Sequence, residues 1–204
     1  EISECLVGSE MCIRDRPYLK EFIRQNPHIS ISISCQSTND TLKLLEDNKI
    51  DIGLIGKPEN LKNIHFDFLE EIEDIFVAAK DYLRNLKARG IQKDHILQSS
   101  TLMLLDKNNM TRQYIDDYLQ ENQIIIKDSI DISDMDLLID FARIGVGVAC
   151  VIKNFVREDL ENGTLMEIPL GFPIHKREVG FAYKTTTKPS KSLAEFIHFY
   201  KTYR

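Results

Sequence analysis

Apolar and polar residues recur along the chain with spacings that predict helices and strands in turn. Pro17 opens a helix that ends at Asn26-Pro27. The segment from Ile29 to Cys35 alternates isoleucine with serine, which is typical of a strand with one buried face. Ser37 to Asp40 then caps a second helix. The further strands predicted in this part of the chain are 50–55, 64–69 and 75–79.

A second set of elements begins near Ser99. Thr101 to Leu105 is a continuous apolar run, as expected for a buried parallel strand. Ser133 is placed as the N-cap of a helix that Gly145 ends. The other predicted strands are 124–126, 146–152, 165–168 and 178–183. The other predicted helices follow Asn108-Asn109, lie around 154–161 and run from Ser190 to Tyr203.

Strands that alternate with helices indicate parallel sheets packed between helices. Two successive sets of similar length predict an α/β protein with two Rossmann-like subdomains. Ligands of such folds bind at the carboxyl ends of the strands, and a central cleft between subdomains is the expected site.

Composition narrows the class of protein. The chain has 204 residues, is 43% hydrophobic and carries a formal net charge of −6. It contains no run of about 18 apolar residues, so no membrane span is expected. No secretory signal is recognised at its start. The acidic balance argues against a nucleic-acid groove, which needs clustered lysine and arginine.

The first sixteen residues, EISECLVGSEMCIRDR, have no useful helical or strand periodicity. They resemble a translated sequencing-adapter scar, and we interpret residues 1–16 as a non-native leader. The alternative is a genuine but poorly ordered N-terminus. Of the four cysteines, Cys5 and Cys12 fall in this leader. Cys35 and Cys150 lie in apolar stretches and are expected to be buried thiols.

No motif of catalysis, metal binding or cofactor binding is found. A GxSxG elbow, a phosphate-binding loop and a GxGxxG after a strand are all missing from the sequence. The five histidines are scattered without metal-ligand spacing. We therefore expect no catalytic residue, no metal site and no cofactor. The acidic run from Glu70 to Asp74 is expected to be a solvated face, with a metal site as a minor alternative.

Four segments in order carry a family resemblance. PYLKEFIRQNPHISISI, CQSTNDTLKLLEDNKIDIGLIGKP, LMLLDKNNMTRQYIDDYL and ISDMDLLIDFARIGVGVACVIKNFV resemble successive parts of the effector-binding domain of LysR-type transcriptional regulators. The resemblance runs from residue 17 to 204 and implies the type 2 periplasmic-binding-protein fold. It implies subdomain I at about 17–77 plus 176–204, and subdomain II at about 78–175.

The resemblance also implies a function. Such a domain binds a small polar metabolite, with an anion as one possibility, between its subdomains and controls a DNA-bound regulator. Family members begin with a winged helix-turn-helix, a small domain that is not recognised here, so DNA would be reached only through that absent N-terminal domain. The family's first strand is expected to be replaced by the leader. A homodimer or tetramer, a cytoplasmic location and no contact with a membrane are implied as well.

Three loops that open helices are the candidate ligand contacts. Unpaired N–H groups and the helix dipole make such loops suited to anions and carbonyl oxygens, and the resemblance places them around the cleft. The candidate effector-binding residues are Ser37, Thr38, Asn108, Thr111, Ile132 and Ser133. For Ser37, Thr38, Asn108 and Ser133 a second interpretation stays open, as N-caps that contribute about 1 kcal/mol each. Arg112 either pairs with an anionic effector or is a solvated first-turn residue, and we favour the second.

Two other functions remain open on the sequence. A solute-binding protein of a transporter has the same fold and would require an export signal upstream. An enzyme on this fold would require a convergent catalytic set in the cleft, and none is found.

Overall fold

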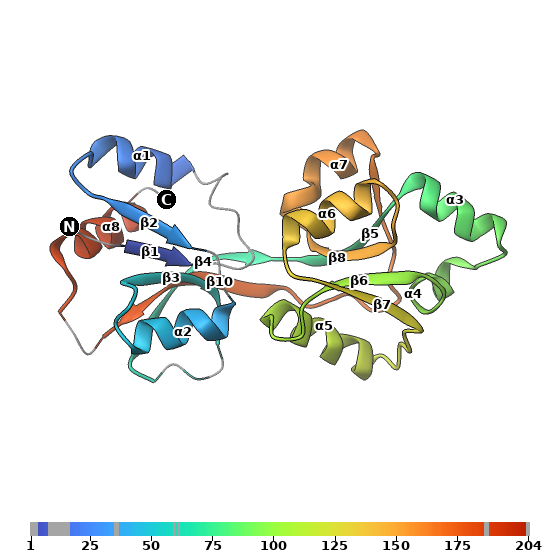
Figure 1. Cartoon of the computed structure of the whole chain (residues 1–204), viewed down its shortest axis with the longest axis horizontal. Coiled ribbons are helices and arrows are strands. Elements are labelled where there is room, and N and C mark those ends of the chain that lie inside the picture. Colours follow the sequence, from blue (N-terminus) through green and yellow to red (C-terminus); the bar gives the residue numbers. More distant parts are fainter. Residues whose placement is uncertain are drawn as a thin grey trace. The chain divides into compact units, whose positions relative to one another are not determined.

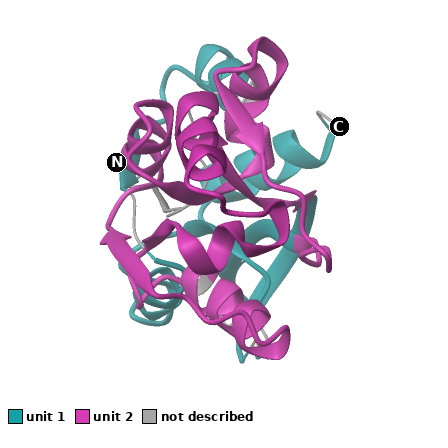
Figure 2. Ribbon diagram, turned by 90° about the vertical axis from the view of Figure 1, so that its right-hand side faces the viewer, with its two compact units in different colours: residues 1–70, 178–204 teal, residues 71–177 magenta. Residues whose placement is uncertain are grey.

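The computed structural model describes residues 4–7, 17–34, 37–58, 60, 62–185 and 188–202. The chain forms two compact units, which Figure 2 colours separately. Unit 1 comprises Glu1–Glu70 and Glu178–Arg204, and unit 2 comprises Glu71–Arg177. The chain thus passes between units at 70–71 and 177–178, where the sequence suggested boundaries near 77 and 176. None of the helices in the described ranges is long and apolar enough to cross a membrane.

Unit 1 is built on a five-stranded sheet with the order β2-β1-β3-β10-β4 (Figure 1). Its strands are β1 (Glu4–Val7), β2 (Ile31–Ser34), β3 (Ile52–Gly56), β4 (Ile64–Ile72) and β10 (Arg177–Lys184). Its helices are α1 (Pro17–Gln25), α2 (Thr38–Glu46) and α8 (Lys191–Thr202). β1 is parallel to β2 and β3, whereas β10 is antiparallel to β3.

The strand β1 lies within residues 1–16, where no element was expected. Its backbone pairs with both β2 and β3, with Leu6 opposite Ile33 on one side and Ile52 on the other. Parallel pairing uses only main-chain N–H and C=O groups, which any non-proline sequence supplies. A strand in this central position pairs with backbone N–H and C=O groups of β2 and β3 that would otherwise lie at exposed sheet edges. Residues 4–7 therefore occupy the sheet position of a first strand that was expected to be lost.

Aromatic side chains form the core of unit 1 where α1 and α8 contribute to it. The rings of Phe22 and Phe196 meet edge to face at 5.0 Å between centroids, and Phe181 of β10 lies 5.4 Å from Phe196. All three side chains are at most 1% exposed. Phe22 and Phe196 thus lie on the buried faces that hold α1 and α8 in the unit.

A polar cluster around Asp67 of β4 also ties α8 to the sheet. Its carboxylate accepts hydrogen bonds from Tyr183 at 2.9 Å, Lys201 at 2.8 Å and Tyr200, and the His65 ring nitrogen lies 2.9 Å away. Burial by itself raises the pKa of Asp67, but the bonds from Lys201, Tyr200, His65 and Tyr183 outweigh it and hold the pKa well below its usual range. Asp67 is therefore ionised wherever the unit is folded near neutral pH.

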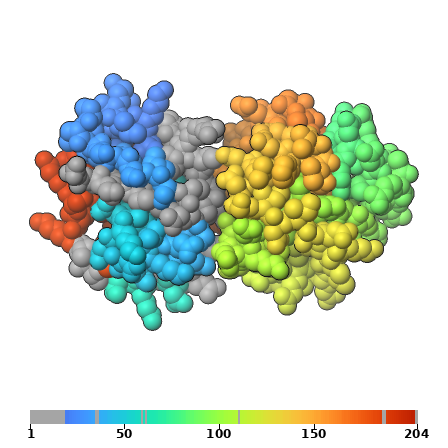
Figure 3. All heavy atoms as spheres, in the orientation of Figure 1, coloured from blue at the N-terminus to red at the C-terminus, as the bar shows by residue number. Residues whose placement is uncertain are grey.

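Unit 2 has a second five-stranded sheet with the order β7-β6-β8-β5-β9 (Figure 1). Its strands are β5 (Asp74–Ala79), β6 (Thr101–Leu105), β7 (Asp128–Ile132), β8 (Val148–Ile152) and β9 (Leu165–Glu167). Its helices are α3 (Lys80–Ala88), α4 (Ile96–Ser99), α5 (Met110–Glu121), α6 (Met135–Arg143) and α7 (Arg157–Asn162), with 3₁₀ turns at Lys93–His95 and Lys153–Val156. Figure 3 shows α3, in green, at the surface of this unit.

Both sheets are mixed, not purely parallel as the alternation of elements suggested. β6 is parallel to β7 and β8, but β5 is antiparallel to β8 and β9. β5 and β10 are the strands that begin at the crossings between units, and each is antiparallel to a neighbour. The parallel arrangement therefore holds for the strands that helices connect within one unit.

The predicted strand at 124–126 is wrong. The chain is irregular there, and the strand is β7, which pairs with β6 from Thr101↔Asp128 to Leu105↔Ile132. β7 is an edge strand with four exposed residues followed by one buried residue. Its polar sequence hides it from a search for apolar runs, whereas Ile124 and Ile126 pack on the core from a non-strand segment.

Glycine is required at two places next to β8. Gly145 follows the last turn of α6 with φ of +80°, which confirms it as the residue that ends this helix. A Cβ atom on Gly147 would lie 2.4 Å from the carbonyl oxygen of Thr101. The close approach of β8 to the start of β6 therefore depends on glycine at 147.

Candidate functional site

The carboxyl ends of β6 and β7 lie side by side in unit 2. Leu105 pairs with Ile132 at the end of the two strands. Beyond that pair, the N–H of Asp106 donates to the carbonyl of Ile132 at 3.1 Å. α5 and α6 begin a few residues after these strand ends. Two helix N-termini, with their unpaired N–H groups and positive dipole ends, are therefore carried on neighbouring loops.

The cap of α5 is the second residue of the predicted pair Asn108-Asn109, and the cap of α6 is one residue later than predicted. Asn109 caps α5, because its Oδ1 accepts a hydrogen bond from the N–H of Thr111 at 2.8 Å. Asp134 caps α6 and accepts from the N–H groups of Asp136 and Leu137 at 2.9 and 3.1 Å. The placement of Ser133 as N-cap is wrong, because the carboxylate one residue on reaches both amides.

Asn108 and Ser133 are consequently not used for capping. Both residues are exposed at the ends of their loops, and the two caps are formed by the residues that follow them. The interpretation of Asn108 and Ser133 as N-caps alone is therefore removed. Their role as ligand contacts stays a prediction.

Arg112 is buried and holds the two strand ends together. Its residue is 6% exposed. The guanidinium donates to the carbonyl of Leu105 at 2.8 Å and to the carboxylate of Asp131 at 2.6 Å. It also donates to Asp116 at 2.8 Å, one turn further along α5. The favoured interpretation as a solvated first-turn residue is wrong, since the side chain joins β6, β7 and α5.

The charge of Arg112 is secured by these partners. Burial by itself lowers the pKa of Arg112, but the hydrogen bonds to Asp116 and Asp131 outweigh it and raise the pKa. A guanidinium with its donors directed at two carboxylates and a carbonyl is already neutralised. Arg112 is thus a positioning residue for the loops, and an incoming anion would have to compete with both carboxylates to reach it.

Thr111 is joined to the first residues of β5 and β10. Its Oγ1 accepts a hydrogen bond at 2.9 Å from Arg177 Nη2. Arg177 also grips both carboxylate oxygens of Asp74, at 2.7 and 3.0 Å, and its guanidinium lies 5.4 Å from the centre of the Tyr114 ring. Asp74 is 2% exposed. The expectation of a solvated acidic run is therefore wrong at Asp74, which is fully paired inside unit 2.

Four of the six predicted contacts are thus gathered at one edge of unit 2: Asn108, Thr111, Ile132 and Ser133. Asn108 and Ser133 are exposed there, whereas Thr111 and Ile132 are 3% and 5% exposed. The buried Arg112 and Asp74 and the partly buried Arg177, which support this edge, were missed or misread. The one signal in the sequence is an arginine, Arg112, in the first turn of a helix, and that position does not identify its partners.

Ser37 and Thr38 belong to unit 1, at the start of α2. Ser37 is confirmed as N-cap: its Oγ accepts from the N–H of Asp40 at 3.2 Å and donates to the Asp40 carboxylate at 2.7 Å. The hydrogen bond from Ser37, with that from Lys43, lowers the pKa of Asp40. Thr38 is 5% exposed. Capping therefore explains Ser37 without a ligand, and ligand contact by either residue stays a prediction.

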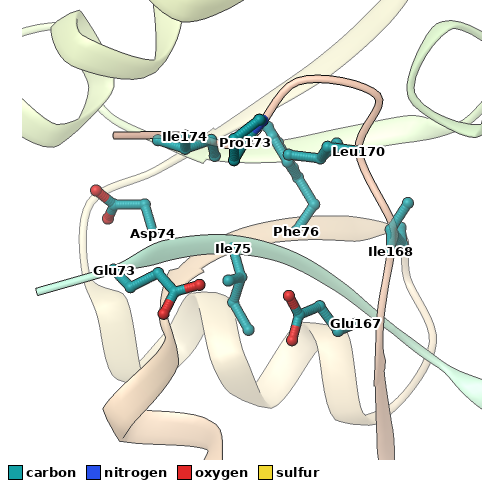
Figure 4. A pocket seen from close by; sticks show the side chains of 9 residues that line it. All are labelled: Glu73, Asp74, Ile75, Phe76, Glu167, Ile168, Leu170, Pro173 and Ile174. Carbon is teal, nitrogen blue, oxygen red and sulfur yellow. The ribbon is translucent and has the colours of Figure 1, made fainter. Parts of the chain in front are cut away.

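A small hollow of about 170 Å³ lies beside Asp74 in unit 2 (Figure 4). It is lined by Glu73, Asp74, Ile75, Phe76, Glu167, Ile168, Leu170, Pro173 and Ile174. Its two glutamates both pair with Lys153, at 3.3 Å from Glu73 and 3.1 Å from Glu167. Because both carboxylates are paired with the same lysine, the hollow offers a ligand few unpaired polar groups. None of the predicted contacts lines it, so the loops remain the candidate site.

Metal binding is not supported by the geometry of the described ranges. Within them, no group of three or more histidine, cysteine, aspartate or glutamate side chains is placed to hold an ion. Cys150 is buried in β8, as expected, at 2% exposure. Cys35 lies outside the described residues.

The chain matches a family model described as LysR substrate binding domain over residues 16–204. The uncharacterized HTH-type transcriptional regulator YeiE of Escherichia coli is 22% identical over 174 residues, 85% of this chain and 58% of that protein. The HTH-type transcriptional activator CmpR of Synechocystis is 23% identical over 159 residues, 78% of this chain and 52% of that protein. This chain therefore spans little more than half the length of these relatives.

Solved structures share the fold at low identity. The regulatory domain of HypT from Salmonella typhimurium superposes with a TM-score of 0.81 at 16% identity, covering 99% of this chain and 94% of that one. The CcmR regulatory domain of Synechocystis in complex with 2-PG gives 0.82 at 13% identity, covering 98% and 96%. The effector-binding domain of QuiR in complex with shikimate gives 0.78 at 17% identity, covering 99% and 95%. The predicted α/β fold of the periplasmic-binding-protein type is confirmed.

Proposed function

Because the chain belongs to the LysR substrate binding domain family, we propose that it is the ligand-sensing part of a bacterial transcriptional regulator. We further propose that the loops before α5 and α6 supply its principal contacts to a small polar, anionic metabolite. The observation that carries this proposal is the pair of helix N-termini on adjacent loops, fixed by the buried Arg112. Such an arrangement favours negative charge without any catalytic group.

Individual residues are proposed to contribute in different ways. Asn108 and Ser133 are exposed side chains beside the two N-termini, so a ligand reaches them without displacing an internal partner. Thr111 and Ile132 are buried, and we expect the ligand to contact the loops that these two residues support. Ser37 and Thr38 are proposed as contacts from unit 1. That one ligand contacts both units at once remains a prediction.

An anionic ligand is the better proposal on electrostatic grounds. The loops present N–H donors. Arg112 is buried, the side chain of Arg177 is 11% exposed, and carboxylates hold both guanidinium groups in place. The nearby carboxylates Asp131, Asp116 and Asp74 are each paired with one of these arginines. A compact carboxylate or phosphate would therefore bind to the oriented N–H donors that the caps Asn109 and Asp134 do not use.

The regulator as a whole is proposed from the relatives. The matched proteins are named as HTH-type regulators, and this chain covers little more than half of each. We propose that DNA is bound by a separate N-terminal domain, that the protein acts in the cytoplasm and that it assembles as a homodimer or tetramer. We propose binding without catalysis, so that the ligand acts by favouring one conformation of the domain.

Titration calorimetry against a panel of metabolite anions tests the proposal. The panel begins with 2-PG and shikimate, because each is bound in one of the similar structures. We expect at least one anion to bind saturably and its uncharged analogue to bind more weakly. Uniformly absent heats with folded protein would contradict the proposal.

A double substitution locates the binding. Asn108→Ala with Ser133→Ala removes two exposed side chains without touching the caps, so we expect affinity to fall about tenfold while stability is unchanged. Asn85→Ala with Ser129→Ala is the matched control, since both residues are exposed in unit 2 but lie on α3 and β7. Equal affinity of the two variants would show that the ligand binds elsewhere.

A further inference from the structure

A groove on unit 2 lies at one end of the strands, and the candidate loops lie at the other end. β5 is antiparallel to β8, with Val77 opposite Ala149, and β8 is parallel to β6, with Ala149 opposite Met103. The end of β5 and the start of α3 therefore lie where β6 and β8 begin, whereas the loops lie where β6 and β7 end. The groove has a volume of about 630 Å³. α3 and α4, both green in Figure 1, border it.

The floor of this groove is apolar. Leu86, Ile96 and Ile168 are 2%, 9% and 2% exposed and belong to the main core of unit 2. Leu83 and Ile91 are half-buried and pack against that core from the groove side. The floor is therefore the outer surface of the core itself, and a bound apolar group would extend the core without rearranging it.

The rim of the groove carries an excess of unpaired positive charge. Its charged residues are Lys80, Arg84, Lys87, Lys93, Asp94 and Glu167. Arg84 pairs with Asp81 at 2.8 Å, and Glu167 pairs with Lys153 at 3.1 Å. In the ranges that the structure describes, Lys80, Lys87 and Lys93 make no ion pair. The rim thus has three unpaired lysines and one unpaired aspartate, Asp94, on a chain whose overall charge is −6.

We propose that this groove is a second binding site, for a small amphipathic carboxylate with one anionic head and an apolar body. The volume lies within the range of about 300–1,000 Å³ that is usual for small-molecule sites. The apolar body would cover the floor at Leu83 and Ile91, and the carboxylate would be drawn to the lysines of the rim. A wholly polar metabolite would leave the floor hydrated, and a neutral apolar compound would leave the lysines unpaired. This site is separate from the loops of the proposed function.

Decanoate, below its micelle-forming concentration, is the probe, with decanol as its uncharged counterpart. Amide chemical shifts of the ¹⁵N-labelled 204-residue chain report where each compound binds. We expect saturable shifts for decanoate at residues 83–96 and 166–169 and at least fivefold weaker binding of decanol. Absence of saturable binding, equal binding of the two compounds or shifts confined to 106–112 and 132–137 would overturn the proposal. If an acidic peptide binds at the groove and decanoate does not, the proposal is overturned as well.

Charge reversal at the rim gives the decisive comparison. Lys87→Glu with Lys93→Glu should weaken decanoate binding about tenfold, because two attractive exposed charges become repulsive. Lys127→Glu with Lys188→Glu is the matched control: both lysines are exposed and neither lines the groove. Both double variants alter only exposed side chains, so each is expected to retain its amide spectrum. Equal loss of affinity in both pairs would reduce the effect to net charge and overturn the assignment.

Discussion

Replacing Arg112 by methionine tests the structural basis of the candidate site. Methionine keeps most of the length of the side chain but removes every hydrogen-bond donor and the charge. The substitution breaks the bonds to the Leu105 carbonyl, to Asp131 and to Asp116. We expect the free energy of unfolding of unit 2 to fall by about 2–3 kcal/mol.

The exposure of each partner sets this magnitude. The side chains of Asp131 and Asp116 are 40% and 47% exposed, so water replaces much of what they lose. Leu105 is 3% exposed, and its carbonyl loses a charged donor in a buried position. That one bond therefore dominates, since a bond to a charged group contributes about 1.5–3 kcal/mol when it is buried. Removing one partner of a fully buried ion pair would cost more, about 3–5 kcal/mol.

Urea unfolding followed by circular dichroism gives the change in stability. Hydrogen exchange of peptides covering 101–121 and 128–143 shows whether the loss lies at the ends of β6 and β7. Arg84→Met is the matched control, because Arg84 pairs with Asp81 at 2.8 Å but the two side chains are 66% and 84% exposed. That control should change stability by no more than about 0.5 kcal/mol.

A Tm decrease of about 4–12 °C is expected for Arg112→Met, at about 2–4 °C per kcal/mol for a chain of this size. If Arg112→Met and Arg84→Met unfold alike, the description of Arg112 as the residue that joins the strand ends is refuted. If hydrogen exchange in peptides 101–121 and 128–143 is unchanged, the description is refuted as well.

Three further substitutions have expected outcomes. Asp67→Asn should lower the unfolding free energy by about 1–3 kcal/mol at pH 7. The pKa of Asp67 is depressed in the folded state, so the stability that its charge contributes is complete above the unfolded pKa of about 3.9 and is lost as pH falls through the folded value. The difference in Tm between the unsubstituted chain and Asp67→Asn should therefore narrow below about pH 4. A difference that stays constant with pH would contradict this. Gly147→Ala should destabilise by about 1–3 kcal/mol in urea unfolding, because its Cβ would meet the Thr101 carbonyl oxygen at 2.4 Å, whereas Gly171→Ala has open space and should be neutral. Asp134→Ala should cost about 1 kcal/mol through loss of the α6 cap, measured in the same way, and no loss would contradict the assignment of the cap.

The sequence predicts those elements whose own residues carry the pattern. The strand at Thr101–Leu105 was predicted with its observed bounds, because a five-residue apolar run buried on both faces has few other uses. β7 was missed because an edge strand exposes most of its side chains and needs no apolar run. β1 was missed because its position comes from the open edges of β2 and β3, which the leader sequence does not reveal.

The site was predicted at the level of loops but not of their support. The loop before α5 follows from the strand end at Leu105 and its capping residues, whereas the loop before α6 follows from capping residues alone, and its cap is Asp134 and not Ser133. The pair of Asp74 with Arg177 joins residues 103 positions apart, and no local pattern specifies such a contact. For the same reason, the sequence around Arg112 does not predict its pairing with Asp131 on the neighbouring strand.

Backbone amide mapping of a bound metabolite tests the central claim most directly. The ¹⁵N-labelled chain is titrated with carboxylate and phosphate metabolites, including 2-PG and shikimate, and each saturable shift is assigned to a residue. We predict that a binding anion shifts the amides of residues 106–112 and 132–137, at the two helix N-termini. A panel in which nothing binds the folded chain, or a bound anion that leaves both of these segments unshifted, would contradict the account.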